Sequence, residues 1–220
     1  MLRISPRARY ARLRIDRRGR VELVLPQGMD RREVPAILAH HRPWVEKTLR
    51  RMAPQLAQAE QPPESIALPA IAQYWQVDYQ YQGRQGYRER APGRLSVQHD
   101  AQWAARLRRW LAGQGKRHLV PWLAAVSDEL GLSYHKVAIR GQKTRWGSCS
   151  AKGNINLNYA LLLLPPEQVR YLLIHELCHT QQLNHSPAFW RLVERHCPDY
   201  RVHDRALRGA MATLPMWLHD

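Results

Sequence analysis

Two histidines four residues apart carry more chemistry than any other part of this chain. His175 and His179 enclose Glu176 in a His-Glu-x-x-His motif, and a third histidine, His185, follows six positions later. On an α-helix, residues four apart lie about 40° apart around the axis and one turn apart along it, so both imidazoles can face one ion. Two such histidines and a third ligand form a zinc site that leaves the fourth position for water. Glu176 lies where a carboxylate can take a proton from that water.

The third histidine reaches the same ion only if the helix ends soon after His179. In an unbroken helix, a residue ten positions after His175 would lie about 15 Å further along the axis. Asn184 tolerates the left-handed backbone conformation that ends helices, and Ser186-Pro187 is typical of the N-cap and first turn of a new helix. The sequence therefore predicts a turn that brings His185 back, with one Zn²⁺ per chain held by the three histidines.

The motif also has an interpretation without a metal, and Cys178 within it has two possible roles. Histidines on an amphipathic helix are often surface residues or hydrogen-bonded core residues. Cys178 lies within ligand range in the sequence, but a buried and inert thiol is the favoured role, because the three histidines already complete a hydrolytic set.

Length and cysteine content suit a folded protein with reduced thiols. The 220 residues are enough for one generous domain or two small ones. The cysteines, Cys149, Cys178 and Cys197, are odd in number and lack the spacing of a disulfide framework. The N-terminus stays charged and no run of roughly 18 apolar residues occurs, so we expect neither a signal peptide nor a membrane span. A cytoplasmic protein is the expectation.

The chain is strongly basic. Its formal net charge is +16, and the first twenty residues hold eight arginines against Asp16 alone. Such a surface can attract a polyanion, either a nucleotide or a nucleic acid, or acidic polypeptides. A solvated basic face with no specific partner is the alternative, because no nucleic-acid-binding motif accompanies the charge.

Apolar periodicity and punctuation by proline and glycine predict the order of the elements. Strands are expected over 12–25 (a hairpin with its turn at 16–19), 75–81, 95–99, 137–140 and 155–159. Helices are expected over about 30–52 with a break or restart at Pro43, over 103–111, over 119–130 with an end at Gly131, and from Pro165-Pro166 onward through His175. The stretch 53–69 is typical of a connection.

These elements predict an α+β fold with two parts. Residues 1–100 would form a small basic β-rich region with one broken helix. Residues 101–220 would form the metallohydrolase domain, in which a small sheet packs on the helix that carries His175.

Six short motifs follow one another along the second half of the chain. They are Arg145-Trp146-Gly147-Ser148-Cys149, Asn156-Leu157-Asn158, His175-Glu176-Leu177-Cys178-His179, Asn184-His185-Ser186, Phe189-Trp190 and Pro198-Asp199-Tyr200. In this order they resemble the YgjP-like metallopeptidase family, which is related through its site to the wider zincin group, including SprT-like proteins. The resemblance is specific over roughly 137–208 and looser over the basic hairpin and helix before it.

The resemblance implies a zincin-like catalytic domain with zinc ligands at His175, His179 and His185 and with Glu176 as the catalytic base. These are the four residues that the helix geometry also selects.

The chain departs from one zincin subgroup. The spacing from the motif to the third histidine equals that of metzincins, but Gln182 stands in place of their turn glycine. Met211 and Met216 follow too late for the methionine turn of that subgroup. The chain therefore resembles a YgjP-like or gluzincin-like variant rather than a metzincin.

Substrate-binding residues are expected in the polar loop and strand before the metal helix. In zincins a strand there often pairs with an extended substrate, and 154–159 is the candidate strand. Arg145 can offer its guanidinium to a carboxylate or phosphate, and Trp146 can wall the cleft or pack in the core. Asn156 and Asn158 complete the candidate set.

The leading functional hypothesis is a zinc-dependent metallopeptidase in which a metal-activated water attacks the peptide bond and Glu176 is the general base. One alternative is a metal-dependent phosphoanhydride hydrolase acting on nucleotides, for which the arginines would suit the polyanion. Another is a nucleic-acid-associated protein with a structural zinc. The sequence leaves open the oxyanion stabiliser among His203, Tyr200 and Arg145, and the carboxylate partners of the histidines among Asp199, Asp204 and Glu194.

Overall fold

The chain folds as two separate units. The computed structural model describes residues 1–16, 19–59, 61–81 and 86–218, with the backbone alone for 55–59. Unit 1 is Met1–Gln61 and unit 2 is Pro62–Asp220. Helices and short sheets alternate without a single repeating pattern, so the fold is of the α+β class that the sequence predicts.

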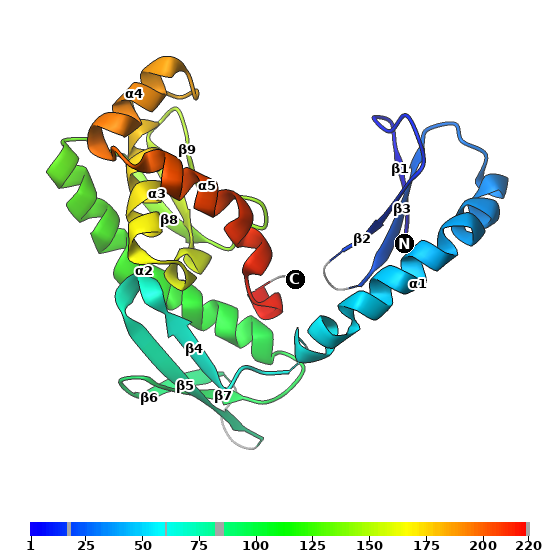
Figure 1. Ribbon diagram of the computed structural model, residues 1–220. Helices are drawn as coiled ribbons and strands as arrows, with labels where there is room; N and C mark the ends of the chain where they lie inside the picture. Colours follow the sequence, from blue (N-terminus) through cyan, green and yellow to red (C-terminus); the bar gives the residue numbers. More distant parts are fainter. Residues whose placement is uncertain (17–18, 60, 82–85, 219–220) are drawn as a thin grey trace. The chain divides into compact units, whose positions relative to one another are not determined.

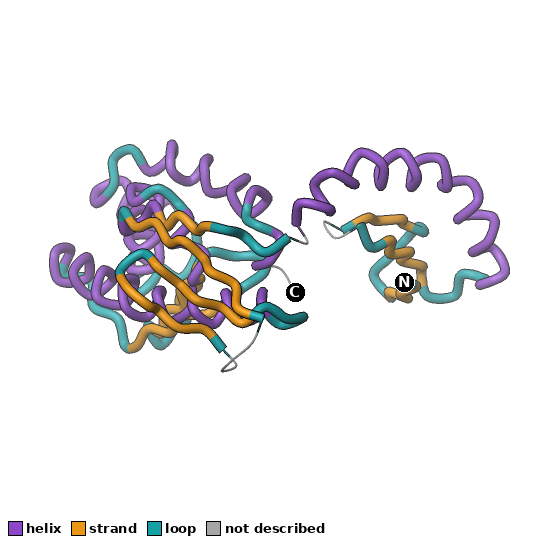
Figure 2. The backbone as a smooth tube through the Cα atoms, turned by 90° about the horizontal axis from the view of Figure 1, so that it is seen from below, coloured by secondary structure: helices purple, strands orange, loops and turns teal. Residues whose placement is uncertain are grey.

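Unit 1 contains one small sheet and one long helix (Figure 2). The central strand β3 pairs with β1 in parallel and with β2 antiparallel, which confirms the predicted hairpin; positions 17–18 of its turn lie outside the described residues. The buried side chains of the sheet are Leu23, Val24 and Leu25. The elements are β1 (Leu2–Ser5), β2 (Arg12–Ile15), β3 (Val21–Pro26), the 3₁₀ helix η1 (Arg31–Glu33) and α1 (Val34–Ala59).

Helix α1 continues through its prolines. The sequence predicts a break or restart at Pro43, but α1 includes both Pro43 and Pro54. A proline leaves the carbonyl four residues earlier without its helical donor. For Pro43 this carbonyl belongs to Ala39, which is exposed, so water can take the place of the missing donor. The prediction of a broken helix was therefore wrong.

Unit 2 is built around the long helix α2, which extends from one sheet to the other (Figure 1). The four-stranded sheet has the order β4-β5-β7-β6, and the three-stranded sheet has the order β8-β10-β9. The first sheet and its helix comprise β4 (Ser65–Leu68), β5 (Gln73–Gln80), β6 (Tyr87–Ala91), β7 (Arg94–Gln98) and α2 (Trp103–Leu130). The remaining elements are β8 (Lys136–Arg140), β9 (Gly147–Cys149), β10 (Asn154–Asn158), the 3₁₀ helix η3 (Tyr159–Leu163), α3 (Pro166–Cys178), α4 (Pro187–His196) and α5 (Tyr200–Ala210).

Helix α2 is one helix where the sequence predicts two. It passes through Pro121 and ends before Gly131, whose φ of 65° confirms the predicted left-handed stop. The interval between the two predicted helices is poor in apolar residues, but Gly115 within it lies against Tyr159, where a Cβ atom would be 3.2 Å from the Tyr159 Cβ. Close packing against η3 therefore keeps this interval helical.

The division between the units falls after Gln61, whereas the sequence predicts it after residue 100. The four-stranded sheet belongs with α2 because its buried face packs on that helix. Trp75 on β5 meets Trp110 on α2 edge to face, with ring centroids 5.3 Å apart. Leu95 and Val97 on β7 are completely buried in the same core.

A polar contact also ties this sheet to α2. Glu89 on β6 accepts hydrogen bonds from the Trp110 Nε1 atom (3.1 Å) and the Gln114 Nε2 atom (2.6 Å), and its second oxygen pairs with Arg117 at 3.1 Å. Trp110 and Gln114 are each about 1% exposed, so water cannot easily reach their N–H groups and accept hydrogen bonds in place of Glu89.

We predict that Glu89→Ala lowers the free energy of unfolding of unit 2 by about 2–3 kcal/mol, because it leaves two buried donors without an acceptor. The control is Glu129→Ala, which removes an exposed pair with Arg170 and should change stability by less than about 1 kcal/mol. Urea unfolding followed by tryptophan fluorescence measures both, since every tryptophan except Trp44 lies in unit 2. Equal effects of the two substitutions would contradict this account of the contact.

Candidate metal centre

Three imidazole rings converge at the C-terminal end of α3. His175 lies in its last turn, His179 is its C-cap, and His185 comes just before α4. The Nε2 atom of His175 is 3.2 Å from Nε2 of His179 and 3.2 Å from Nε2 of His185. With Zn–N bonds of about 2.0–2.1 Å, two nitrogens of a tetrahedral site lie roughly 3.3 Å apart. The three nitrogens therefore have the spacing of ligands to one ion.

The turn that returns His185 follows the prediction in outline. Helix α3 ends at Cys178, and α4 begins at Pro187 with Ser186 as N-cap, whose hydroxyl accepts a hydrogen bond from the backbone N–H of Phe189. Asn184 is not in the left-handed conformation, since Ala72 is the sole non-glycine with positive φ among the described residues. The backbone N–H groups of residues 181 and 182 instead both donate to the Cys178 carbonyl, which tightens the end of the helix.

Hydrogen bonds on the far side of two rings leave their Nε2 atoms unprotonated. The Nδ1 atom of His179 is 2.9 Å from the Gln182 carbonyl oxygen, which only accepts, so Nδ1 carries the proton. The Tyr171 hydroxyl donates to Asp204 at 3.3 Å, so its oxygen accepts from Nδ1 of His175, also at 3.3 Å. Two lone pairs on Nε2 atoms thus face each other at 3.2 Å, an arrangement that repels unless a cation lies between them.

Burial keeps these rings in the form that binds metals. Burial above all, and then the charges of His179 and His185, lower the pKa of His175 to about 3, while Asp204 acts in the opposite direction. Burial also lowers the pKa of His179, against the hydrogen bond to Gln182, which raises it. Because a metal ligand must be neutral imidazole, a low pKa means that protons compete less with the ion.

His185 is oriented by aromatic contacts. Its ring stacks on Trp190 with centroids 5.5 Å apart and meets Phe189 edge to face at 4.9 Å. Trp190 in turn stacks on Tyr200 of α5 at 5.2 Å. The guanidinium of Arg201 lies over the Tyr200 ring, 5.6 Å from its centroid. This aromatic stack connects the exposed third histidine to α4 and α5.

Glu176 is buried beside the histidines against the backbone of β9. Burial raises its pKa to about 8, and the charge of Arg145 acts in the opposite direction. A Cβ atom on Gly147 would clash with the Glu176 carboxylate, so glycine is required for this close approach. The Oε2 atom of Glu176 is buried and has no hydrogen-bond partner among the described residues. One carboxylate oxygen is therefore able to accept a proton or a hydrogen bond from a bound molecule.

A pocket of about 260 Å³ opens over this carboxylate. Its lining includes Thr144, Trp146, Gly147, His175, Glu176 and Asp204, and we call it the catalytic pocket. Neutral nitrogen donors, a buried carboxylate with an available oxygen and an adjoining pocket together fit a resident metal ion.

The family profile described as YgjP-like, metallopeptidase domain matches residues 9–210 of the chain. The chain belongs to the YgjP-like metallopeptidase family. It is accordingly a metal-dependent hydrolase, and the resemblance seen in the sequence motifs is confirmed. No curated protein gives a significant match. A solved structure, the metallopeptidase zymogen of Pyrococcus abyssi abylysin, is 33% identical, with 41% of this chain and 91% of that chain covered and a TM-score of 0.37.

Within this YgjP-like domain, the two predicted loop residues differ in burial. Trp146 is 8% exposed, its Nε1 atom donates to the Leu207 carbonyl at 3.1 Å, and one side of it lines the catalytic pocket. It therefore both walls the pocket and packs in the core. Arg145 is exposed, and its charge acts on Glu176.

The two predicted asparagines lie on β10 and are engaged within the protein. Asn156 donates to the Ser148 hydroxyl at 3.2 Å. Asn158 is buried, and its amide donates to the carbonyls of Gln142 (2.7 Å) and Arg145 (3.1 Å). Asn158 thus holds the loop that carries Arg145, and neither asparagine lines the catalytic pocket.

The strand expected to pair with substrate is a central one. Strand β10 is flanked by β8 on one side and β9 on the other, so both of its backbone edges are occupied. The expectation that 154–159 accepts a substrate strand was therefore wrong. The free edge near Glu176 belongs to β9, the short strand that contains Gly147.

Tyr171 is a site residue that the sequence reasoning missed. It lies four residues before His175, the same one-turn spacing that selected His179, and this spacing was the available signal. Asp204, one of the three carboxylates considered, is the one that the Tyr171 hydroxyl contacts. Asp199 instead pairs with His203 at 3.0 Å.

The thiols match the predicted inert role. Cys178 is completely buried, and burial raises its pKa to about 12. Burial likewise raises the pKa of Cys149 to about 11. Thiols so rarely ionised are poor metal ligands and nucleophiles.

We predict that Gly147→Ala lowers the free energy of unfolding of unit 2 by about 1–3 kcal/mol, because the added methyl group forces β9 and the Glu176 carboxylate apart. The matched control is Gly209→Ala in α5, where a Cβ atom would meet nothing within 4 Å and where alanine favours the helix. Urea unfolding would show the contrast. A Gly147→Ala protein as stable as the Gly209→Ala protein would rule out the close approach described here.

Proposed function

We propose that this metal-dependent peptidase uses one zinc ion per chain, bound by His175, His179 and His185, with Glu176 as the general base. The observation that carries the proposal is the convergence of three Nε2 atoms, with those of His179 and His185 each 3.2 Å from that of His175. Three nitrogen ligands with a fourth position open to a pocket are typical of catalytic rather than structural zinc.

In the proposed mechanism Glu176 moves the proton. When bound, the ion lowers the pKa of a water molecule and polarises the carbonyl of the peptide bond. The Oε2 atom of Glu176, which has no hydrogen-bond partner among the described residues, accepts the proton of the attacking water. The same carboxyl then delivers the proton to the departing amine. The close backbone of Gly147 limits movement of the carboxylate and excludes water from that side.

We further propose that an extended polypeptide substrate pairs with the free edge of β9. A short strand beside the catalytic carboxylate offers unpaired backbone groups to such a chain. Trp146, in the pocket wall, would contact a substrate side chain, and the exposed Arg145 would contact a substrate carbonyl or carboxylate. Asn156 and Asn158 would act by holding β9 and the Arg145 loop in place.

The two alternative functions have less support from the site. A structural zinc is normally enclosed by four protein ligands, and the three histidines have no such fourth ligand among the described residues that could hold a metal. A nucleotide phosphoanhydride hydrolase and a polyanion partner rest on the net charge of +16 and on arginines near the site such as Arg145, without a phosphate-binding loop motif in the sequence. None of the described helices has the length and apolar character needed to cross a bilayer.

We predict that the purified protein contains about one zinc per chain and that His185→Ala loses most of it, because two imidazoles alone bind the ion weakly. The control is His203→Ala. His203, with Cys197 and Asp199, forms a second group whose donor atoms also lie within 4.8 Å of one another. Elemental analysis of the three proteins decides between the sites. If His185→Ala keeps its zinc and His203→Ala loses it, the ion is bound by the group that contains His203, and the proposed site is wrong.

We predict that Glu176→Gln keeps its zinc and its fold but hydrolyses peptides about 10²–10⁴-fold more slowly, because an amide has the shape of the carboxylate and accepts no proton. Turnover is measured on unfolded casein and, in parallel, on a nucleoside triphosphate. Retained peptide cleavage would exclude Glu176 as the base. Zinc-dependent cleavage of the nucleotide without cleavage of casein would favour the phosphoanhydride alternative.

A further inference from the structure

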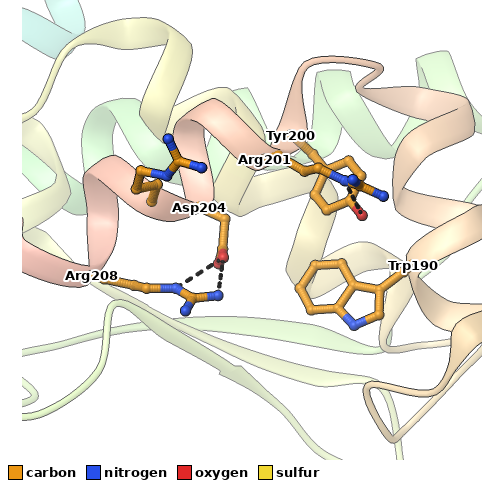
Figure 3. Close-up of a pocket in the computed structure, with 6 residues that line it drawn as sticks. Trp190, Tyr200, Arg201, Asp204 and Arg208 are labelled. Atoms are coloured by element: carbon orange, nitrogen blue, oxygen red, sulfur yellow. Dashed lines mark hydrogen bonds and ion pairs between the residues drawn. The ribbon is translucent and has the colours of Figure 1, made fainter.

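A second pocket adjoins the catalytic pocket between α4 and α5. It has a volume of about 380 Å³ and is lined by Trp190, Tyr200, Arg201, Asp204, Arg205 and Arg208 (Figure 3). Asp204 and Arg208 line both pockets, so the two pockets are neighbours that share this ion pair. Trp190 forms one wall and stacks on His185. We call this second pocket the arginine pocket. A peptide long enough to pass the Asp204–Arg208 pair from Glu176 would reach it.

The arginine pocket carries an excess of positive charge. Its three arginines lie at positions 201, 205 and 208, which fall on one face of α5 and face a single carboxylate. That carboxylate, Asp204, is already engaged, because Arg208 donates to it at 2.6 and 3.1 Å and the Tyr171 hydroxyl donates to its other oxygen. Arg205 is therefore not neutralised within the pocket, and neither is Arg201, although the charge of Glu194 outside the lining also acts on Arg201.

Arg201 and Arg205 differ from Arg208 in their contacts. Arg205 is exposed and forms no ion pair with any residue that the structure describes. Arg201 donates through Nε to the Tyr200 hydroxyl at 3.2 Å and lies over that ring, which leaves its terminal nitrogens as donors. An aromatic wall lowers the local dielectric, so these charges attract an anion more strongly than they would on a flat, solvated face.

We propose that the arginine pocket is a subsite for a carboxylate of the peptide substrate, bound by Arg205 and Arg201. This inference rests on the proposed peptidase function. The planar guanidinium presents paired donors that match the two oxygens of a carboxylate. The carboxylate comes either from an Asp or Glu side chain or from the C-terminus of the substrate. Arg208 is not the anchor, because its bonds to Asp204 support the Tyr171 contact with His175.

The test compares cleavage of matched synthetic peptides by the zinc-loaded full chain. One set moves a single Glu through the positions on both sides of the cleaved bond, with Gln as the neutral counterpart. A second set has free or amidated C-termini. We expect kcat/KM to be about tenfold higher for the peptide that carries a carboxylate at one defined position. Dependence on Glu identifies a side chain as the ligand, and dependence on the free terminus identifies the C-terminal carboxylate.

The variants connect this preference to the pocket. Arg205→Gln should lower the ratio of acidic to neutral cleavage about fivefold, and the double variant Arg201→Gln/Arg205→Gln should bring it close to one. Arg205→Glu should shift the preference towards Lys at the same position. The matched control is Arg109→Gln, which removes an exposed arginine in the second turn of α2, outside this pocket, and should leave the ratio as in the wild type. Zinc content and circular dichroism confirm that each variant is folded.

Two results would overturn the subsite. In the first, Arg205→Gln lowers the preference for acidic peptides no more than Arg109→Gln does. The preference would then come from the net charge of the whole chain and not from the pocket. The other is efficient cleavage with no acidic preference in the wild type. Failure of the zinc-loaded wild type to cleave any peptide would instead overturn the proposed peptidase function, and the subsite with it, so the two failures are distinct.

Discussion

The site depends on one geometric requirement, that the Nε2 atoms of three histidines from a single short segment meet within bonding distance of one ion. A helix supplies two of them at no cost in backbone strain, but it carries the third away at about 1.5 Å per residue. Helix α3 therefore ends at Cys178, and the chain reverses before α4 begins. Because the chain reverses, α4 and α5 lie close enough for their aromatic side chains to hold the third histidine. Phe189 and Trp190 hold the third ring, and Tyr200 holds Trp190.

The second requirement is a dry carboxylate beside the ligands. Glu176 is 4% exposed, and the wall that covers it is backbone rather than side chain, because β9 approaches at a glycine. Strand β9 is held in turn by β10, and Asn158 on β10 fixes the loop before β9. The small sheet thus supports the carboxylate, and in the proposed peptidase its β9 edge and the arginines of α5 would shape the side that a substrate enters.

The sequence predicted the chemistry of this chain better than its domain organisation. Ligand spacing is a local property of a helix, so His175, His179 and the break before Ser186 were visible in the residues. The boundary after Gln61 was not visible, because it depends on the packing of Trp75 against Trp110, a contact between segments far apart in the chain. The continuous course of α1 was missed for a related reason, because a proline signals a break but exposure of the affected carbonyl lets the helix continue. In α2 the interval between the two predicted helices is poor in apolar residues, and packing of Gly115 on Tyr159 keeps it helical.

The same distinction applies to the strand expected to pair with substrate. Alternating apolar residues identify Asn154–Asn158 as a strand but do not tell a central strand from an edge strand. That difference is set by β9, whose three residues are too few to show a pattern. Tyr171 was within reach of the argument used for the histidines, since it occupies the same helix face one turn earlier.

The short span of the metal ligands also has a consequence for how the protein matures. His175 and His185 are ten positions apart, and closing so small a loop demands little chain entropy. Gly147 lies far upstream of Glu176, and Tyr200 lies well downstream of His185, so the walls of the site form through longer-range contacts that assemble more slowly. In the proposed zinc peptidase, the three histidines would then come together before the pocket around them closes. An ion bound at that stage would give the unfinished fold a fixed point around which α4, α5 and β9 settle.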